Sequence, residues 1–94
     1  MHVRLSDTAQ SDLDQIHSYI AAENERAAER VIDALLSAIY QLESFPFLGH
    51  PGRVSETREL KVPRLPYFVV YWIPDEFNLE IITIIHARRQ YPPA

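Results

Sequence analysis

The sequence contains no cysteine and only two glycines. Without cysteine there is neither a disulfide framework nor a thiolate for catalysis or metal binding, which suits a cytoplasmic protein. Two glycines cannot build a phosphate-binding loop or a dinucleotide-binding fingerprint, because both motifs need glycine at several fixed positions. The enzyme classes that depend on these motifs are therefore excluded.

The chain also lacks a long apolar segment and a positive charge balance. Its longest apolar run, YFVVYWI at 67–73, is far shorter than the ~20 residues of a membrane-spanning helix. The first residues, MHVRLSD, lack the apolar centre of a secretory signal, so we expect no membrane association. The net charge of −4 and the pI of about 5.4 disfavour nucleic acid as the main partner, since proteins that bind phosphate backbones are usually basic.

The apolar content is sufficient for one folded domain. The chain has 94 residues, of which 47 % are hydrophobic. A chain of this length buries about two-thirds of its unfolded surface on folding. We therefore expect a single domain over residues 1–94, without repeats or low-complexity segments.

The first half of the chain predicts a short strand followed by two amphipathic helices. Val3 and Leu5 alternate with polar residues in a strand at 2–6, and Ser6 or Asp7 can cap the first helix. Asn24 can cap the second, which runs up to Phe45-Pro46. Apolar residues recur at helical spacing in both: Ala9, Leu13, Ile16 and Ile20, then Ala28, Val31, Leu35, Ala38, Ile39 and Leu42. At 3.6 residues per turn the helices have about four and nearly six turns, and they form an antiparallel hairpin.

The second half predicts three strands after a turn-rich loop at 46–52. These strands cover residues 57–62, 67–73 and 79–86, and a loop at 74–78 joins the last two as a hairpin. Alternation along the first strand separates Arg58, Leu60 and Val62 from Glu59 and Lys61. The order β-α-α-β-β-β predicts an α+β fold in which the helical hairpin packs on a small, mostly antiparallel sheet.

Both faces of the last two strands are apolar in this pattern. In the strand at 67–73, one face is expected to carry Tyr67, Val69, Tyr71 and Ile73, and the other Phe68, Val70 and Trp72. In the strand at 79–86, one face is expected to carry Leu79, Ile81 and Ile85, and the other Ile82 and Ile84. Two helices can cover only one face of a sheet. The second face therefore needs a partner protein, a second copy of the chain, or cover from the loop that carries Phe45, Phe47 and Leu48.

Candidate chemistry is confined to the basic sheet half of the chain. No metal or cofactor is expected, because the four histidines lie in different predicted elements without paired spacing: His2, His17, His50 and His86. His86 and Arg88 share strand parity and could emerge on the face of Ile82 and Ile84. An imidazole beside guanidinium groups could serve as an acid or base in phosphodiester cleavage. Alternatively, His86 simply ends a strand and the arginines keep its edge soluble.

Four stretches together resemble the RelE/ParE toxin superfamily of bacterial type II toxin–antitoxin modules over nearly the whole chain. They are LESFPFLG, GHPGRV, TRELKVPRLPYFVVYW and EIITIIHARRQYP, in this order and at this spacing. The resemblance implies a small cytoplasmic toxin that inhibits growth and takes part in plasmid stabilisation. It also implies a toxin–antitoxin hetero-oligomer, in which the tail of a cognate antitoxin wraps over the toxin.

Two activities exist in this superfamily. RelE-like members cut mRNA on the ribosome without a metal ion, and the resemblance would then assign catalysis to Arg53, Arg58, Lys61, His86, Arg88 and Tyr91. ParE-like members are not nucleases; they bind DNA gyrase and trap it on broken DNA. In that case Arg88, Arg89 and Tyr91 would form a target-binding rim.

Three features favour the ParE-like interpretation, with the RelE-like nuclease as the alternative, so that enzymatic activity is left open. Phe68 stands where the nucleases place an arginine, and a phenyl ring cannot supply charge to a scissile phosphate. The acidic net charge gives little attraction to ribosomal RNA. The two long predicted helices also look more ParE-like than RelE-like.

Overall fold

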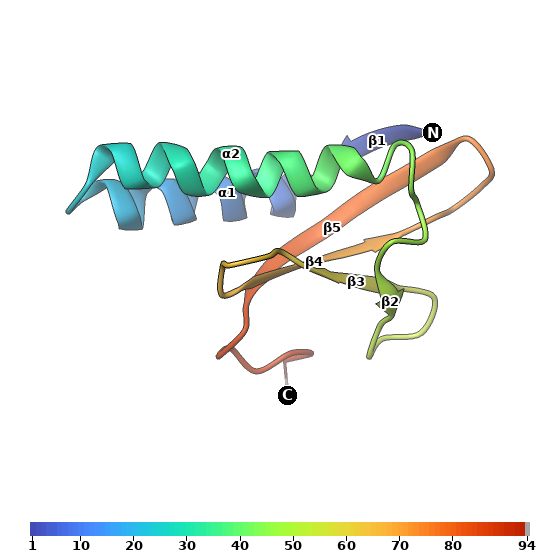
Figure 1. The fold of residues 1–94 in the computed structure, drawn as a ribbon. Coiled ribbons are helices and arrows are strands. Elements are labelled where there is room, and N and C mark those ends of the chain that lie inside the picture. Colours follow the sequence, from blue (N-terminus) through green and yellow to red (C-terminus); the bar gives the residue numbers. More distant parts are fainter. Residues whose placement is uncertain (94) are drawn as a thin grey trace.

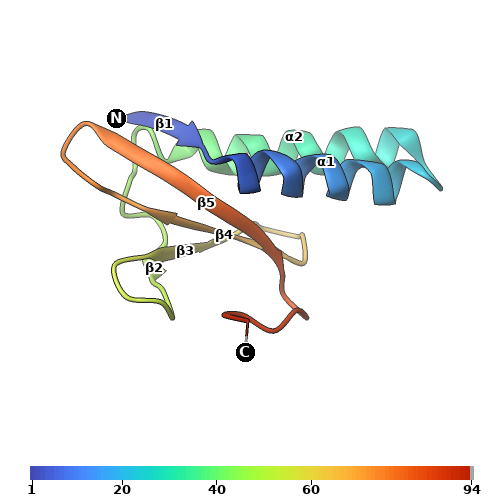
Figure 2. The same ribbon diagram turned by 180° about the vertical axis from the view of Figure 1, so that it is seen from behind.

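The structure, a computed structural model, describes residues 1–93. Strand β1 (His2–Leu5) leads into helices α1 (Asp7–Ala21) and α2 (Glu25–Gln41). Four strands follow: β2 (His50–Pro51), β3 (Arg58–Lys61), β4 (Tyr67–Trp72) and β5 (Asn78–His86). The two helices form a hairpin on one side of the sheet, and the C-terminus lies on the other side (Figures 1 and 2). The predicted α+β fold is confirmed.

The five strands form one sheet in the order β1-β5-β4-β3-β2. β1 runs parallel to β5, and every other pair is antiparallel, so the sheet is mostly antiparallel as predicted. The two-residue strand β2 was not predicted, because it lies inside the turn-rich loop. It pairs His50 with Glu59 and Pro51 with Arg58, and thereby holds this loop against β3.

Side-chain caps begin both helices. The Ser6 hydroxyl accepts a hydrogen bond from the Ala9 amide at 3.0 Å, and the Asn24 side chain accepts from the Ala27 amide at 3.0 Å. α2 has 17 residues, about five turns, and is shorter than predicted. Its end is tightened by amides that bond to carbonyls three positions earlier, including Leu42 to Ile39 and Ser44 to Gln41.

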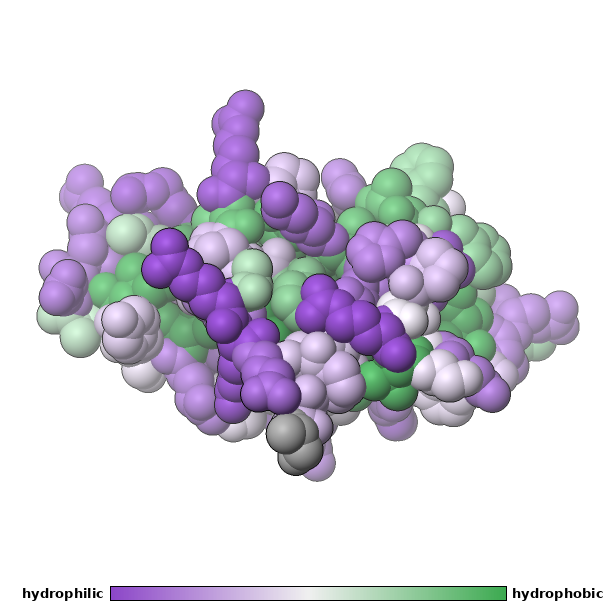
Figure 3. Space-filling model, turned by 90° about the horizontal axis from the view of Figure 1, so that it is seen from below, coloured by the Kyte–Doolittle hydropathy of each residue, from purple (hydrophilic) through white to green (hydrophobic). Residues whose placement is uncertain are grey.

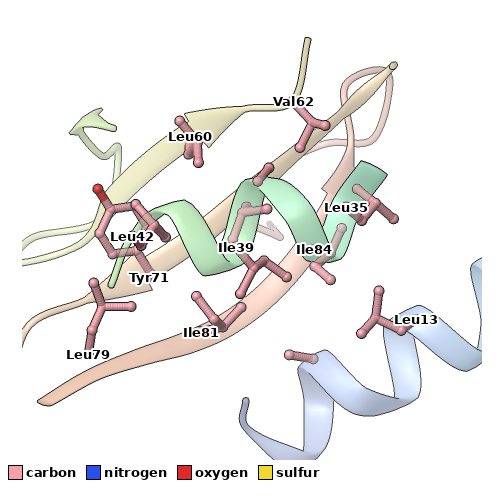
Figure 4. Close-up of a cluster of buried hydrophobic side chains, with 13 residues drawn as sticks. Leu13, Leu35, Ile39, Leu42, Leu60, Val62, Tyr71, Leu79, Ile81 and Ile84 are labelled. Carbon is pink, nitrogen blue, oxygen red and sulfur yellow. The ribbon is translucent and has the colours of Figure 1, made fainter. Parts of the chain in front are cut away.

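The main core lies between the helical hairpin and the sheet (Figure 4). Leu35, Ile39 and Leu42 are fully buried against strand residues such as Val69 and Ile81. Ile20, which was predicted to join this core, is only partly buried and lies outside the cluster. Ile20 is near the end of α1, where the tip of the hairpin projects beyond the sheet (Figure 1).

The second half of β5 differs from the prediction, because an irregularity in the strand changes which side chains lie on which face of the sheet. The register with β4 shifts between Val70 and Tyr71, which is the mark of a β-bulge. Ile84 therefore joins Ile81 under the helices, whereas Ile85 joins Ile82 on the opposite face. Strict alternation had placed both residues on the wrong faces.

Polar side chains at the start of α1 complete the free edge of β5 beyond the end of β1. The Ser6 hydroxyl donates to the Ile82 carbonyl at 2.7 Å. The Asp12 carboxylate accepts from the Ile84 amide at 3.0 Å and from the Thr83 hydroxyl. These bonds replace the strand neighbour that β5 lacks there. Within residues 1–93, neither helix has the length and apolarity to cross a membrane.

Candidate functional site: the tail face of the sheet

The sheet face away from the helices carries a second, smaller apolar cluster. Phe68, Val70 and Ile85 are buried there, and Ile82 and Tyr91 pack against them. We call this surface, with the C-terminal segment 87–93 that lies under it, the tail face. Figure 3 shows it from below: hydrophilic side chains extend across it, and hydrophobic surface is visible between them.

The loop residues expected as possible cover do not cover this face. Phe45, Phe47 and Leu48 are 64 %, 69 % and 49 % exposed, and none of them packs against the second cluster. Their loop is instead fixed to β4 by Tyr71, whose buried hydroxyl donates to the Pro46 carbonyl and accepts from the Gly49 amide. The C-terminal segment supplies the cover, through Tyr91.

Arg53 and Glu59 form the charged part of the tail face. The side chain of Glu59 is 3 % exposed, and its carboxylate lies 3.4 Å from Nε of Arg53. The other carboxylate oxygen accepts from the Arg53 backbone amide at 2.9 Å. Arg53 is thus fixed to one buried carboxylate through both its main chain and its side chain, while its side chain stays half exposed.

The guanidinium of Arg53 lies against two aromatic rings. It is 5.0 Å from the ring centroid of Phe68 and 5.9 Å from that of Tyr91, within the range of cation–π attraction. The two rings meet edge to face, with centroids 5.8 Å apart. Arg53 also donates to the Tyr91 carbonyl at 3.3 Å. Burial raises the pKa of the Tyr91 phenol, the Glu59 carboxylate raises it further, and Arg53 partly offsets this.

Arg58 lies on the helix side of the sheet and has a structural role there. Its Nε donates to the Gly49 carbonyl at 3.1 Å, and its terminal nitrogen also donates to Phe47 and Gly49. The guanidinium lies 5.2 Å from the Phe47 ring centroid. These bonds close the turn-rich loop, and they leave Arg58 on the other side of β3 from Tyr91.

His86 is also on the helix side, and the side chain of Arg89 reaches that side from the C-terminal segment. His86 pairs with Tyr67 in the sheet register, and the two rings meet edge to face at 5.3 Å. With Arg89 it lines a hollow of about 360 Å³ beside α1, to which Asp12 and Tyr19 also contribute. Burial raises the pKa of Tyr67, and Tyr19 adds to this effect. This hollow is separate from the Tyr91 cluster.

Lys61 and Arg88 are exposed, and neither forms an ion pair within residues 1–93. Lys61 pairs with Phe68 in register, which places it on the tail face. The backbone amide of Arg88 donates to Nδ1 of His86 at 3.1 Å, so β5 ends in a turn and the predicted parity of His86 and Arg88 does not apply.

The structure therefore brings together Arg53 and Tyr91, with Lys61 on the same face, and separates them from Arg58, His86 and Arg89. The sequence-based prediction missed Glu59 and the packing role of Phe68. One signal could have revealed Glu59: strand alternation places its carboxylate on an apolar face, where a charge needs a cationic partner.

A second ion pair lies at the other end of the tail face. Arg4 of β1 donates to Glu80 of β5 at 2.8 Å, and the Trp72 indole donates to the same carboxylate at 3.1 Å. Hydrogen bonds from Arg4 and Trp72 lower the pKa of Glu80. Over residues 1–93, no group of three side chains is placed to hold a metal ion.

Comparison with known proteins identifies the family. The model for the ParE toxin of the parDE type II toxin–antitoxin system matches residues 3–91. The chain is 39 % identical over 80 residues to "Putative toxin Y4kP" of Sinorhizobium fredii, which covers 85 % of this chain and 81 % of that protein. The chain therefore belongs to the ParE toxin family, and it is a toxin of a type II toxin–antitoxin system.

Two solved structures share the fold. A chain of the chromosomal ParDE system from P. aeruginosa superposes with a TM-score of 0.82 at 20 % identity, covering 94 % of this chain and 97 % of that one. A chain of the RelBE2 toxin–antitoxin complex from Mycobacterium tuberculosis gives 0.68 at 24 % identity, covering 90 % and 95 %. At these identities the likeness concerns the fold alone.

Proposed function

We propose that this toxin poisons DNA gyrase, and that a cognate antitoxin neutralises it in a cytoplasmic hetero-oligomeric complex. The observation that carries the gyrase proposal is the separation of His86 from Tyr91 and Arg53 by the sheet. A nuclease without a metal ion needs its acid, its base and its phosphate-binding cations around one phosphate. In this fold the candidate groups are divided between two faces.

The pairing of charges supports the same proposal. Arg53 and Arg4 are each held by a carboxylate, and Arg58 is bonded to backbone carbonyls. A guanidinium whose charge is already compensated by a carboxylate attracts a phosphate less strongly than an unpaired one. Phe68 adds to this argument, because its ring lies under Arg53, where a nuclease would need a further cation.

The exposed C-terminal segment offers contacts suited to a protein target. Arg88 and Arg89 are exposed, and Tyr91, which follows Arg89 by two residues, presents a partly exposed ring on the tail face. Arginine and tyrosine are enriched among the residues that dominate protein–protein binding energy. We therefore assign Arg88, Arg89 and Tyr91 to the rim of the gyrase-binding surface.

Controlled expression in cells tests the proposal against its alternative. The toxin is expressed from a tightly regulated promoter without antitoxin, and cells are examined early. Gyrase poisoning predicts double-strand breaks, an SOS response and filamentation while translation continues. The RelE-like alternative, in which Arg53, Arg58, Lys61, His86, Arg88 and Tyr91 would serve mRNA cleavage on the ribosome, predicts rapid loss of translation with cuts in mRNA. That second result would refute the proposal.

A matched control comes from the helical hairpin. Arg26 and Arg30 are exposed arginines of α2, and the helices and the C-terminus lie on opposite sides of the sheet (Figure 1). Replacing both by alanine removes the same charge as replacing Arg88 and Arg89. If the rim assignment is correct, only the Arg88/Arg89 variant loses double-strand breaks.

A further inference from the structure

Among residues 1–93, Glu59 is the only charged residue that is buried. Its carboxylate is among the buried groups of the sheet, yet it lies on the face that no helix covers. It accepts the Arg53 amide with one oxygen and faces the Arg53 guanidinium with the other. A buried carboxylate with one cationic partner holds that partner in a defined position.

The consequence for Arg53 is a fixed orientation. A free arginine side chain at the surface samples many rotamers, and ordering it costs conformational entropy. Here the guanidinium lies between a buried anion and the rings of Phe68 and Tyr91. One of its terminal nitrogens donates to the Tyr91 carbonyl.

The consequence for the C-terminal segment follows directly. Residues 87–93 form no helix or strand, and most of their side chains are exposed. At the start of the segment, the Ala87 amide donates to the carbonyl of Pro66, the residue just before β4, at 2.7 Å. Farther along, Tyr91 contacts Phe68 and Arg53.

From these contacts we infer that Glu59 is a positioning residue: through Arg53 it holds Tyr91 on Phe68, and so makes the C-terminal segment a fixed part of the toxin surface. This inference extends the proposed function, and it rests on that function for one point: that the C-terminal segment contacts gyrase. A preordered segment loses less entropy on binding than a free arm. Glu59 thus acts through Arg53 and Tyr91, without touching the target.

The test uses the full-length chain with Glu59→Gln, which keeps the size and one acceptor oxygen but removes the charge. Glu56→Gln is the matched control, because Glu56 is an exposed carboxylate in the loop between β2 and β3, three residues before Glu59. The structural readout is the nuclear Overhauser effect between the rings of Phe68 and Tyr91. The functional readout is the toxin concentration needed to inhibit supercoiling by gyrase.

We expect Glu59→Gln to stay folded, to lose the Phe68–Tyr91 ring contact, and to need about tenfold more toxin, the loss expected for one charge-assisted hydrogen bond. Glu56→Gln should behave as the parent. An intact ring contact in folded Glu59→Gln overturns the inference. If the parent itself fails to inhibit gyrase, the proposed function falls, while the ring contact still decides the role of Glu59.

A double variant covers the case in which Glu59→Gln does not fold. Arg53→Met with Glu59→Gln removes both charges together, so that no unpaired charge is left at the buried position. The inference predicts a folded protein without the ring contact. Unfolding of both variants overturns it, because the pair would then be needed for the fold and not for the segment.

Discussion

His86 and Tyr91 lie on opposite faces of the sheet. His86 contacts Tyr67, and Tyr91 contacts Phe68. Tyr67 and Phe68 are consecutive residues of β4, so their side chains point to opposite sides of the sheet. The two residues therefore share no partner, although both belong to the short stretch from which a nuclease of this superfamily would draw its acid and base.

This separation predicts that the effects of His86→Ala and Tyr91→Ala on gyrase inhibition are independent. Mutations without shared partners usually add within about 0.5 kcal/mol, whereas residues that act as one catalytic unit are strongly non-additive. The measurement is a double-mutant cycle on the inhibitory concentration. A double variant no weaker than Tyr91→Ala alone, with a strong effect of each single change, would contradict the separation.

Leu35→Ala should destabilise the protein by about 2–5 kcal/mol. Leu35 is fully buried where α2 meets the sheet, so its truncation leaves a cavity under the helix. Leu48→Ala is the matched control, because Leu48 is 49 % exposed in the loop after α2 and should cost less than about 0.5 kcal/mol. Urea denaturation of the two variants measures both values, and equal losses would mean that the helical hairpin does not pack as described.

Asp12→Ala should cost about 1.5–3 kcal/mol, as expected for lost hydrogen bonds to a charged group. The carboxylate accepts from Thr83 and from the Ile84 amide at the edge of β5, and its removal leaves that amide without a partner. Asp14→Ala, an exposed neighbour on α1, is the control and should be nearly neutral. Hydrogen exchange of the Ile84 amide should accelerate only in the first variant; unchanged protection would show that Asp12 does not complete the edge.

Tyr91 predicts a loss of stability at alkaline pH. Its pKa is raised above the ordinary value of 10.0, mainly by burial and then by Glu59. A raised pKa in the folded state means that the neutral phenol contributes stability below the ordinary pKa, and that this contribution is lost as the pH rises through the folded-state pKa. The free energy of unfolding of the parent should therefore fall more steeply above pH 10 than that of Tyr91→Phe. The pKa of Tyr67 is also raised, but this effect is common to both proteins and cancels in the comparison. Superimposable curves of unfolding free energy against pH would contradict the packing of Tyr91.

The sequence predicted the elements of this fold well, because each has a local physical signal. Ser6 and Asn24 cap the helices as expected, and the stripe through Leu35 and Ile39 is buried as its period requires. The faces of β4 also follow strict alternation: Val69 and Tyr71 lie under the helices, and Phe68 and Val70 lie on the tail face.

The errors arose where tertiary contacts override the local pattern. The β-bulge in β5 moved Ile84 and Ile85 to faces that simple alternation does not predict. In the same way, the turn after His86 divides the C-terminal residues between two sides of the sheet, and no periodicity in this stretch marks that turn. Glu59 was not predicted as a site residue, because its partner Arg53 belongs to a loop whose path the sequence does not specify.

The central claim is that this ParE-family toxin acts on gyrase through its C-terminal segment, and supercoiling of relaxed DNA by purified gyrase tests it most directly. The parent toxin and a variant with His86, Arg88, Arg89 and Tyr91 all replaced by alanine are titrated into the reaction. We predict that the parent inhibits supercoiling and accumulates cleaved DNA. The variant should do so only weakly, while it still folds and binds its antitoxin. Unimpaired supercoiling in the presence of a folded parent toxin, at concentrations that cut mRNA on ribosomes, would contradict the claim.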